Sequence, residues 1–221
     1  MNFWGSADKI SCFPDCGCEF LDVSHIIIQP MAAYSSFFYW IAAFYLLKRH
    51  YQNKEVFHIW IGLLLILGLS SFLVHASWTR WAGAMDFASI VACLSFFLLI
   101  RFVKSYRAFW VFIYYILLFC MFYFMSGWPR IGLASSIFLG TLWELRERFG
   151  AKVIFDSYIL KLVTLLLLSF SLFIIDELRI LCDPHGWVHG HTIWHLGGAL
   201  TIALYGDWRF KKPKITESSK V

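Results

Sequence analysis

The feature that most constrains this chain is a series of continuous apolar stretches, most of them long enough to cross a membrane. The hydrocarbon core of a bilayer is about 30 Å thick, so roughly 20 residues of helix span it. The stretches lie at about 26–47, 56–76, 84–102, 108–126, 130–143, 153–176 and 187–205. Because they are apolar throughout and do not alternate, they predict helices rather than barrel strands. We therefore expect an all-α membrane protein, a seven-transmembrane helix bundle.

The composition excludes a soluble globular protein. Hydrophobic residues make up 60% of the chain and charged residues 15%, against roughly 45–50% and about 25% in soluble proteins. So few charges cannot cover the surface of a domain of this size, and the outside of the protein must face lipid. The net charge of +5 is therefore interpreted through the positions of the basic residues relative to the membrane. We expect the lipid bilayer as partner, no nucleic acid and no obligate protein partner.

The basic residues predict the direction of the chain. The connections after the first, third and fifth stretches, together with the tail, hold 14 lysines and arginines. The opposite ends hold 4, namely Lys9, Arg80, Arg130 and Arg179. Because cytoplasmic loops of membrane proteins are rich in lysine and arginine, the N-terminus is predicted outside and the C-terminus in the cytoplasm. This divides the chain into an outer segment (1–25), a transmembrane domain (26–205) and a basic cytoplasmic tail (206–221).

Cysteines concentrate on the predicted outer side, where disulfides are permitted. Four of the six cysteines lie there, and these are Cys12, Cys16, Cys18 and Cys182. Four cysteines allow three pairings, and the spacing does not choose among them.

A few polar residues interrupt the apolar stretches at one predicted depth. Ser71 and His75 are four residues apart, as are His191 and His195, so each pair shares one helical face. Asp86 lies near the start of the third stretch. With the predicted direction, all five lie in the outer, periplasmic or luminal half of the membrane. A single intramembrane histidine is commonly a packing residue, but a convergent set of ionisable groups indicates a functional site.

Three histidines with an acid and a hydroxyl are typical of a hydrolytic metal site. Catalytic zinc takes three protein ligands and leaves a fourth position for water, whose pKa falls to about 7. A nearby carboxylate can take the proton of that water and pass it to the leaving group, which is the role predicted for Asp86. A hydroxyl can stabilise the developing oxyanion, which is the role predicted for Ser71.

These residues also resemble the signature of a known family. Ser71-x3-His75-x10-Asp86, followed by His191-Thr-Ile-Trp-His195, looks like the motif of the alkaline ceramidases and of the wider CREST superfamily of seven-helix membrane hydrolases. Cys18-Glu19 and Gln29-Pro30 are similar to the residues that precede the first helix in that family. The resemblance extends from about residue 16 to 205.

The resemblance implies a zinc ion held by His75, His191 and His195, and attack of the zinc-bound water with Asp86 as general acid and base. It also implies a lipid substrate with an amide bond, the same N-out and C-in direction, and a disulfide between Cys18 and Cys182. Eukaryotic members bind calcium through acidic residues near the N-terminus, and Asp15, Glu19 and Asp22 could supply oxygen ligands here. Gln29-Pro30 stands where the family has an acid, so we interpret the three acids as helix-capping residues and keep Ca²⁺ as the alternative.

Neighbouring polar residues are interpreted without catalytic roles. His185 and His189 are predicted to be surface or loop histidines, since His189 points to a different helical face from His191. Asp176, at the outer end of its stretch, could line the access of substrate.

The leading hypothesis is a zinc-dependent amidohydrolase of lipid metabolism. It would cleave the N-acyl bond of ceramide or a related lipid amide into a fatty acid and an amine, the sphingoid base in the case of ceramide. The alternatives are a lipid esterase of the same superfamily and a seven-helix lipid-binding receptor resembling the adiponectin and progestin receptors. A receptor needs no nucleophilic water, which makes the hydrolase the preferred prediction.

Overall fold

The computed structural model describes residues 4, 7–10, 17–49, 54–125, 135, 138–140, 142–143, 145–146, 150, 156–180 and 182–211. Its named elements are all helices, and outside them the described residues form one isolated bridge between Lys9 and Thr79. The helices are α1 (Pro30–Ser35), α2 (Phe37–Leu47), α3 (Lys54–Ser77), α4 (Arg80–Phe102), α5 (Arg107–Phe124), α7 (Ser157–Glu177) and α8 (Gly190–Lys211).

Five helical spans in the described part of the chain are long and apolar enough to cross a membrane. They are α1 and α2 taken together, α3, α4, α5 and α7. These spans match five of the seven predicted stretches and indicate a membrane-embedded helical protein. The stretch predicted at 130–143 lies mostly outside the described residues. The stretch predicted at 187–205 is helix α8, whose histidines and charged last turns lower its hydropathy below that of a typical span.

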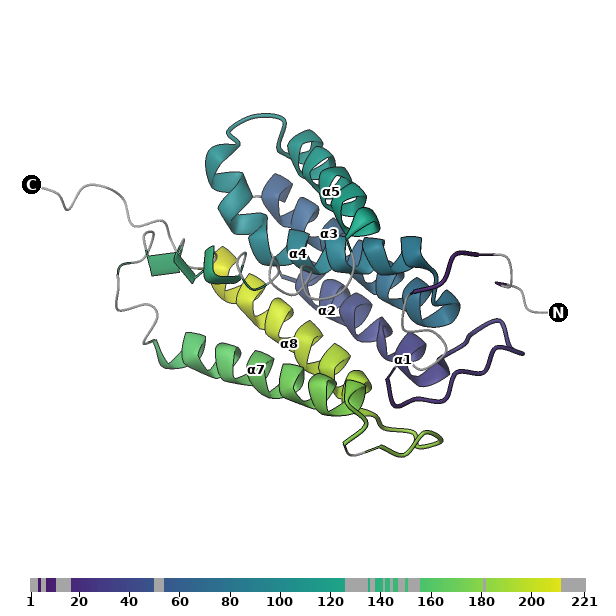
Figure 1. The fold of residues 1–221 in the computed structure, drawn as a ribbon. Helices are drawn as coiled ribbons and strands as arrows, with labels where there is room; N and C mark the ends of the chain where they lie inside the picture. The colour runs from purple at the N-terminus through teal and green to yellow at the C-terminus, as the bar shows by residue number, and fades with distance from the viewer. Residues whose placement is uncertain are drawn as a thin grey trace, which may run out of the picture.

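The helices follow one another in an arc (Figure 1). α5 packs against α4, α4 against α3, and α3 against the short helices α1 and α2. α8 then packs against α1 and α2 on one side and against α7 on the other. α3 and α8, which are far apart in the sequence, are therefore both held against α1 and α2 in the middle of the arc.

Small residues let the central helices approach closely. α4 buries Ala82, Ala84, Ala88 and Ala92, so its backbone can lie near α3 without large side chains between them. Towards the start of α3, the ring of Trp60 contacts those of Phe96 and Phe97 at centroid distances of 5.2 and 5.0 Å. The end of α3 carries polar side chains, among them Ser71 and His75.

A single residue separates α1 from α2. Ser36 keeps right-handed helical angles, but its N–H bonds to the oxygen of Ala33, three residues back, and the N–H of Tyr39 bonds to Ser36 in the same way. This is a tight 3₁₀-like turn inside one span, a feature that often marks a functional position in a helix. The turn places two consecutive serines, Ser35 and Ser36, towards the middle of the arc.

The outer segment is attached to the ends of α7 and α8. Cys18 forms a disulfide with Cys182, and their Cα atoms are 5.5 Å apart. Arg179 Nε donates to the oxygen of Gly17 at 2.8 Å, and the N–H of Phe20 donates to Pro184 at 3.0 Å. Gly17 has a φ of +68°, a backbone conformation that glycine adopts without strain. The segment is thereby fixed beside the outer ends of both helices.

Helix α8 continues beyond the predicted domain boundary at 205. It ends at Lys211, and Asp207 in its last turns is mostly buried. The Asp207 carboxylate pairs with Lys211 at 2.5 Å and with Arg49 at 3.8 Å. Residues 206–211 therefore belong to the bundle, and residues 212–221 lie outside the described part of the chain.

Candidate metal centre

Three histidines from two helices meet at the end of the bundle where α3 ends and α8 begins. His191 and His195 lie one turn apart on α8, and His75 lies near the end of α3. The ring centroids are 4.5 Å apart for His75 and His191, 5.1 Å for His75 and His195, and 4.9 Å for His191 and His195. One ligand atom from each histidine lies within 4.8 Å of the other two. This spacing suits three ligands of a single metal ion.

The three rings differ in their exposure. His75 is 3% exposed and His195 is 2% exposed, whereas the side chain of His191 keeps 16% of its surface exposed. Two ligands are thus enclosed by protein, and the third borders a region open to solvent or to a substrate. A catalytic metal needs such an open side, because a closed site has no room for water or substrate.

Each histidine has its Nδ1 atom beside a different acceptor. The Nδ1 of His75 lies 2.9 Å from Gln29 Oε1, that of His195 lies 2.7 Å from Ser35 Oγ, and that of His191 lies 3.4 Å from Glu177 Oε1. A proton on Nδ1 is thereby favoured in each ring, and Nε2 is left as the nitrogen with a free electron pair. Metal-binding histidines commonly have this second partner, which fixes the tautomer and the orientation of the ring.

Backbone contacts explain how Gln29 reaches His75. The N–H groups of Ile28 and Gln29 donate to the oxygens of Ala76 and His75 at 3.1 and 3.0 Å. The residues just before α1 therefore run along the end of α3, and the side chain of Gln29 lies beside the histidine whose backbone it contacts. Ser35 approaches His195 because α1 packs against α8.

The sequence motif did not identify these three acceptors. Gln29 was noted only in the family resemblance and not as a partner of a histidine. Ser35 lay within an apolar stretch, and Glu177 lay at the end of another. The signal that was present is the polarity of Ser35 and Ser36 inside a predicted span, since membrane helices bury such groups against polar partners.

Ser71 lies directly beside the histidines. Its hydroxyl is 3.2 Å from Nε2 of His195, and it accepts a hydrogen bond from Ser36 at 3.0 Å. Because Ser36 donates to it, Ser71 keeps its own proton for another acceptor. The predicted neighbour of the metal ligands is thus in contact with one of them.

Asp86 lies on α4, within electrostatic reach of His191. Its Oδ1 atom is buried and has no hydrogen-bond partner in the part of the chain that the structure describes. A buried carboxylate oxygen without a donor is costly and is a common mark of a functional group. The structure therefore brings four of the five residues predicted for the site into one cluster, and Asp86 lies within electrostatic range of one of them.

The proposed calcium ligands have other partners where the structure describes them. Both oxygens of Glu19 accept backbone N–H groups at the start of α1, from Met31 at 2.7 Å and Ala32 at 2.9 Å. Burial raises the pKa of the Glu19 carboxyl, and these two hydrogen bonds oppose the rise. Glu19 thus caps the start of α1, as the preferred interpretation expected.

Asp22 has local partners of its own. It accepts from the Ser24 hydroxyl at 2.5 Å and lies 2.7 Å from Nδ1 of His25. The bond from the Ser24 hydroxyl is the main cause that lowers the pKa of Asp22. Asp15 lies outside the described residues.

Of the four outer cysteines, the structure pairs Cys18 with Cys182, the disulfide that the family resemblance implies. Cys12 and Cys16 lie outside the described residues.

Two residues beside the site are more buried than their predicted roles suggest. His189, predicted to be a surface or loop histidine, lies in the loop just before α8 but is only 4% exposed. Asp176 is buried too, and it accepts backbone N–H groups from Gly190 at 2.8 Å and Cys18 at 3.4 Å. Asp176 therefore joins α7, α8 and the outer segment. His185 is exposed, as expected.

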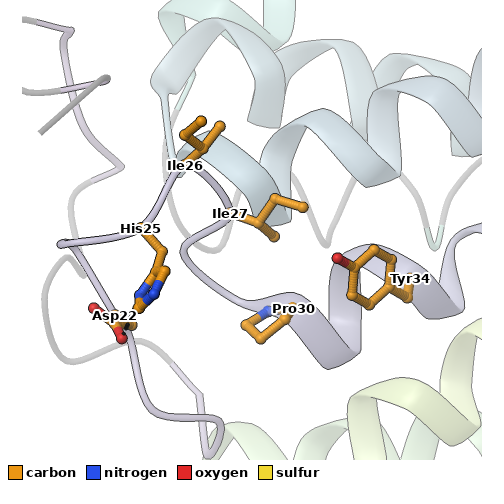
Figure 2. A pocket seen from close by; sticks show the side chains of 6 residues that line it. All are labelled: Asp22, His25, Ile26, Ile27, Pro30 and Tyr34. Atoms are coloured by element: carbon orange, nitrogen blue, oxygen red, sulfur yellow. Dashed lines mark hydrogen bonds and ion pairs between the residues drawn. The ribbon is translucent and has the colours of Figure 1, made fainter.

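A separate pocket of about 450 Å³ lies between the outer segment and α1. Figure 2 shows His25 and Asp22 together on one side of it and Tyr34 on the other, with apolar side chains between them. None of the three ligand histidines lines this pocket.

Comparison with known proteins found no matching family model, curated protein or solved structure.

Proposed function

We propose that this chain is a zinc-dependent intramembrane hydrolase that cleaves the N-acyl amide bond of ceramide or a related lipid amide. The observation that carries the proposal is the meeting of His75, His191 and His195, each with a separate acceptor at Nδ1. Three neutral imidazoles that present Nε2 to one point fit zinc, which accepts nitrogen ligands in a tetrahedral arrangement. The partial exposure of His191 supports an open fourth position.

A zinc ion in this position would supply an activated water and polarise the carbonyl oxygen of the substrate. The protein supplies the proton transfers. Asp86 has a buried oxygen without a donor and is close to His191, so it can accept a proton from the attacking water. The same carboxyl then donates that proton to the leaving nitrogen, which must be protonated before the C–N bond breaks.

Ser71 is suited to stabilise the oxyanion that forms at the substrate carbonyl. Its hydroxyl accepts from Ser36 and points towards Nε2 of His195. When Nε2 is occupied by a metal ligand bond, the Ser71 proton needs another acceptor. The carbonyl oxygen of the substrate beside the same histidine is such an acceptor, and its charge increases in the transition state.

The surroundings of the site support a lipid substrate. α5 and α7 expose large apolar side chains on their outer faces, among them Phe112, Leu117, Leu160 and Leu168. A long-chain lipid could approach between helices with its amide at the histidines and its chains among such residues. We further propose a multi-pass arrangement of seven spans with the N-terminus outside, which places the site in the outer half of the membrane.

The proposal is tested by metal content and turnover of the purified protein in detergent. We expect about one zinc per chain, and loss of both zinc and hydrolysis in His75→Ala, His191→Ala and His195→Ala. Asp86→Asn should keep the zinc and reduce turnover by about 10²–10⁴-fold, the usual contribution of a general acid or base. Exposed His185→Ala is the matched control and should keep both properties. Full hydrolysis in the three histidine variants would refute the mechanism.

A substrate panel separates the related functions. The panel holds ceramides, other N-acyl amides and lipid esters of equal chain length, and release of fatty acid is measured. Preferential cleavage of the amides supports the proposal. Preferential cleavage of the esters would assign the same site to an esterase, and saturable lipid binding without any release would assign the fold to a receptor.

A further inference from the structure

A second cluster of metal-ligating side chains lies beside the three histidines and shares none of them. It consists of Cys18, Asp176 and His189, whose ligand atoms all lie within 4.8 Å of one another. The three residues come from the outer segment, the end of α7 and the start of α8. The proposed hydrolysis uses none of them.

His189 gives this cluster an unpartnered ligand atom. The residue is 4% exposed, and its Nε2 is buried with no hydrogen-bond partner among the described residues. The backbone of His189 is engaged, since its N–H and its oxygen both bond to Thr192 Oγ1, at 2.8 and 2.7 Å. These bonds hold the backbone of His189 in place, while one nitrogen of its buried ring is left without a partner, which is costly for a buried polar atom.

Asp176 can supply an oxygen to the same point. Its Oδ1 accepts the N–H of Gly190 at 2.8 Å, whereas its Oδ2 has only a long contact of 3.4 Å with the N–H of Cys18. One oxygen thus fixes the carboxylate, and the other faces the cysteine. An anchored carboxylate of this kind is well placed as a metal ligand.

The number of side chains that can bind a metal in this cluster depends on whether the disulfide is formed. With Cys18 bonded to Cys182, only Asp176 and His189 remain as donors. After reduction the sulfur of Cys18 becomes a donor, and the sulfur of Cys182, its partner in the disulfide, lies next to it. The set is then two thiolates, one imidazole and one carboxylate, four ligands of the types that zinc binds in a tetrahedral arrangement.

We propose that Cys18, Cys182, His189 and Asp176 form a second transition-metal site, which binds one zinc ion when the disulfide is reduced. The metal would connect the outer segment to α7 and α8, the same elements that the disulfide connects. The protein thus has two alternative cross-links at this position, a covalent one in an oxidising environment and a metal one in a reducing environment.

The reductive step is a thiol–disulfide exchange with a dithiol reductant. Cys182 is partly exposed and Cys18 is buried, so a thiolate of the reductant attacks Sγ of Cys182 and Cys18 leaves as a thiolate. The second thiol of the reductant then releases Cys182, and the reductant becomes a disulfide. Two electrons pass to the cysteine pair. When zinc binds, the two cysteines coordinate as thiolates and any protons they carry go to solvent.

The test uses the full chain in detergent with His75→Ala, so that the first site does not contribute metal. Samples are prepared with the disulfide intact or reduced by a phosphine, which cuts the same bond and takes up one oxygen from water. Each sample is equilibrated with zinc, desalted and analysed for bound metal. We expect no zinc in the oxidised protein and one zinc per chain in the reduced protein.

Replacing zinc with cobalt shows whether thiolates bind the metal. Co²⁺ bound by thiolates gives a sulfur-to-metal charge-transfer band, which we expect only in the reduced protein. Adding His189→Gln should weaken binding at least tenfold, whereas exposed His185→Gln in the same loop should leave it unchanged. Circular dichroism of each variant establishes that the helices are retained.

Equal metal content in oxidised and reduced protein, or cobalt binding without the charge-transfer band, would overturn the proposal. Either result would leave the hydrolase proposal intact, because that proposal concerns the oxidised protein with His75 present.

Discussion

At the scale of residues, the three ligand histidines are held by three different chemical groups, an amide, a carboxylate and a hydroxyl. The Oε1 atom of Gln29 lies 2.9 Å from Nδ1 of His75, whose ring is buried at the end of α3. The amide therefore determines which nitrogen of His75 carries the proton. The consequence is a testable role for a residue that touches neither metal nor substrate.

We expect Gln29→Leu to weaken zinc binding by about 10–100-fold, the usual effect of removing such a partner. The physical reason is that Nδ1–H of His75 would be buried without an acceptor and the ring would be free to change tautomer. Gln29→Glu keeps an acceptor oxygen and should restore most of the affinity. Zinc affinity is measured by competition with a chelator. Equal affinities for wild type and Gln29→Leu would contradict the assigned role.

Ser71 provides a second prediction at this scale. Ser71→Ala should lower kcat by about 10²–10³-fold with little change in zinc content, because the hydroxyl acts on the transition state rather than on the metal. The neighbouring Ser70 is the matched control. It is equally buried, but its hydroxyl bonds to Leu67 and Ser89 and does not approach the histidines. Ser70→Ala should keep kcat within a few fold, and equal losses in the two variants would remove the oxyanion role from Ser71.

The meeting of the three histidines could be predicted from the sequence, whereas their Nδ1 partners could not. His191 and His195 are four residues apart, so helical periodicity alone places them on one face. Gln29, Ser35 and Glu177 act through contacts between elements, and no local spacing encodes such contacts. The burial of His189 could not be predicted either, because it too depends on tertiary contacts of a loop residue.

At the scale of elements, α7 and α8 pack closely against each other because α8 has glycines at the contact. A Cβ atom at Gly190 would meet the backbone of Leu172, and one at Gly197 would meet the side chain of Ser169. These glycines let α8 lie against α7 with little between them. The contact also fixes the height of His191 and His195, which lie between the two glycines along α8.

Gly197→Ala should therefore lower stability by about 1–3 kcal/mol, the usual cost of overpacking. An added Cβ would lie 2.7 Å from Cβ of Ser169 and closer still to its hydroxyl. Thermal unfolding in detergent measures the effect. Adding Ser169→Gly should recover most of the loss, because it removes both atoms that clash. Gly62→Ala on α3 is the control, since nothing lies within 4 Å of its Cβ position, and alanine there should be neutral or stabilising.

The positions of the helices could be predicted from the apolar stretches, but the end of α8 and the break at Ser36 could not. Helices α3, α4 and α5 begin and end within a few residues of the predicted stretches, because hydrophobicity sets which residues can lie in lipid. α8 extends to Lys211, since Asp207 pairs with Arg49 and Lys211 and makes charged residues acceptable at that end. The break at Ser36 had no sequence signal beyond two adjacent serines, because a one-residue 3₁₀ turn changes neither length nor hydropathy.

At the scale of the whole molecule, the two ends of the bundle have different contacts. The outer segment contacts one end, where the oxygen of Asp8 accepts the N–H of Arg80 at the start of α4 and Lys9 donates to Ser77 at the end of α3. At the other end of α4 lies the connection to α5, with Lys104 exposed. Residues near Asp8 and Lys104 therefore mark opposite ends of a single helix, and their accessibility reports the direction of the chain.

The loop charges predict that Asp8 faces the outside and Lys104 the cytoplasm. We expect a membrane-impermeant maleimide to label Asp8→Cys in intact cells and to label Lys104→Cys only after permeabilisation, in a background with exposed Cys120 replaced by serine. Labelling is compared with that background, which corrects for the remaining cysteines. Asp8 makes an exposed ion pair with Arg80 at 3.5 Å, worth at most about 1 kcal/mol, so its replacement should not disturb the fold. The reverse labelling would place the histidines in the cytoplasmic half of the membrane. The disulfide between Cys18 and Cys182 would then lie in a reducing environment.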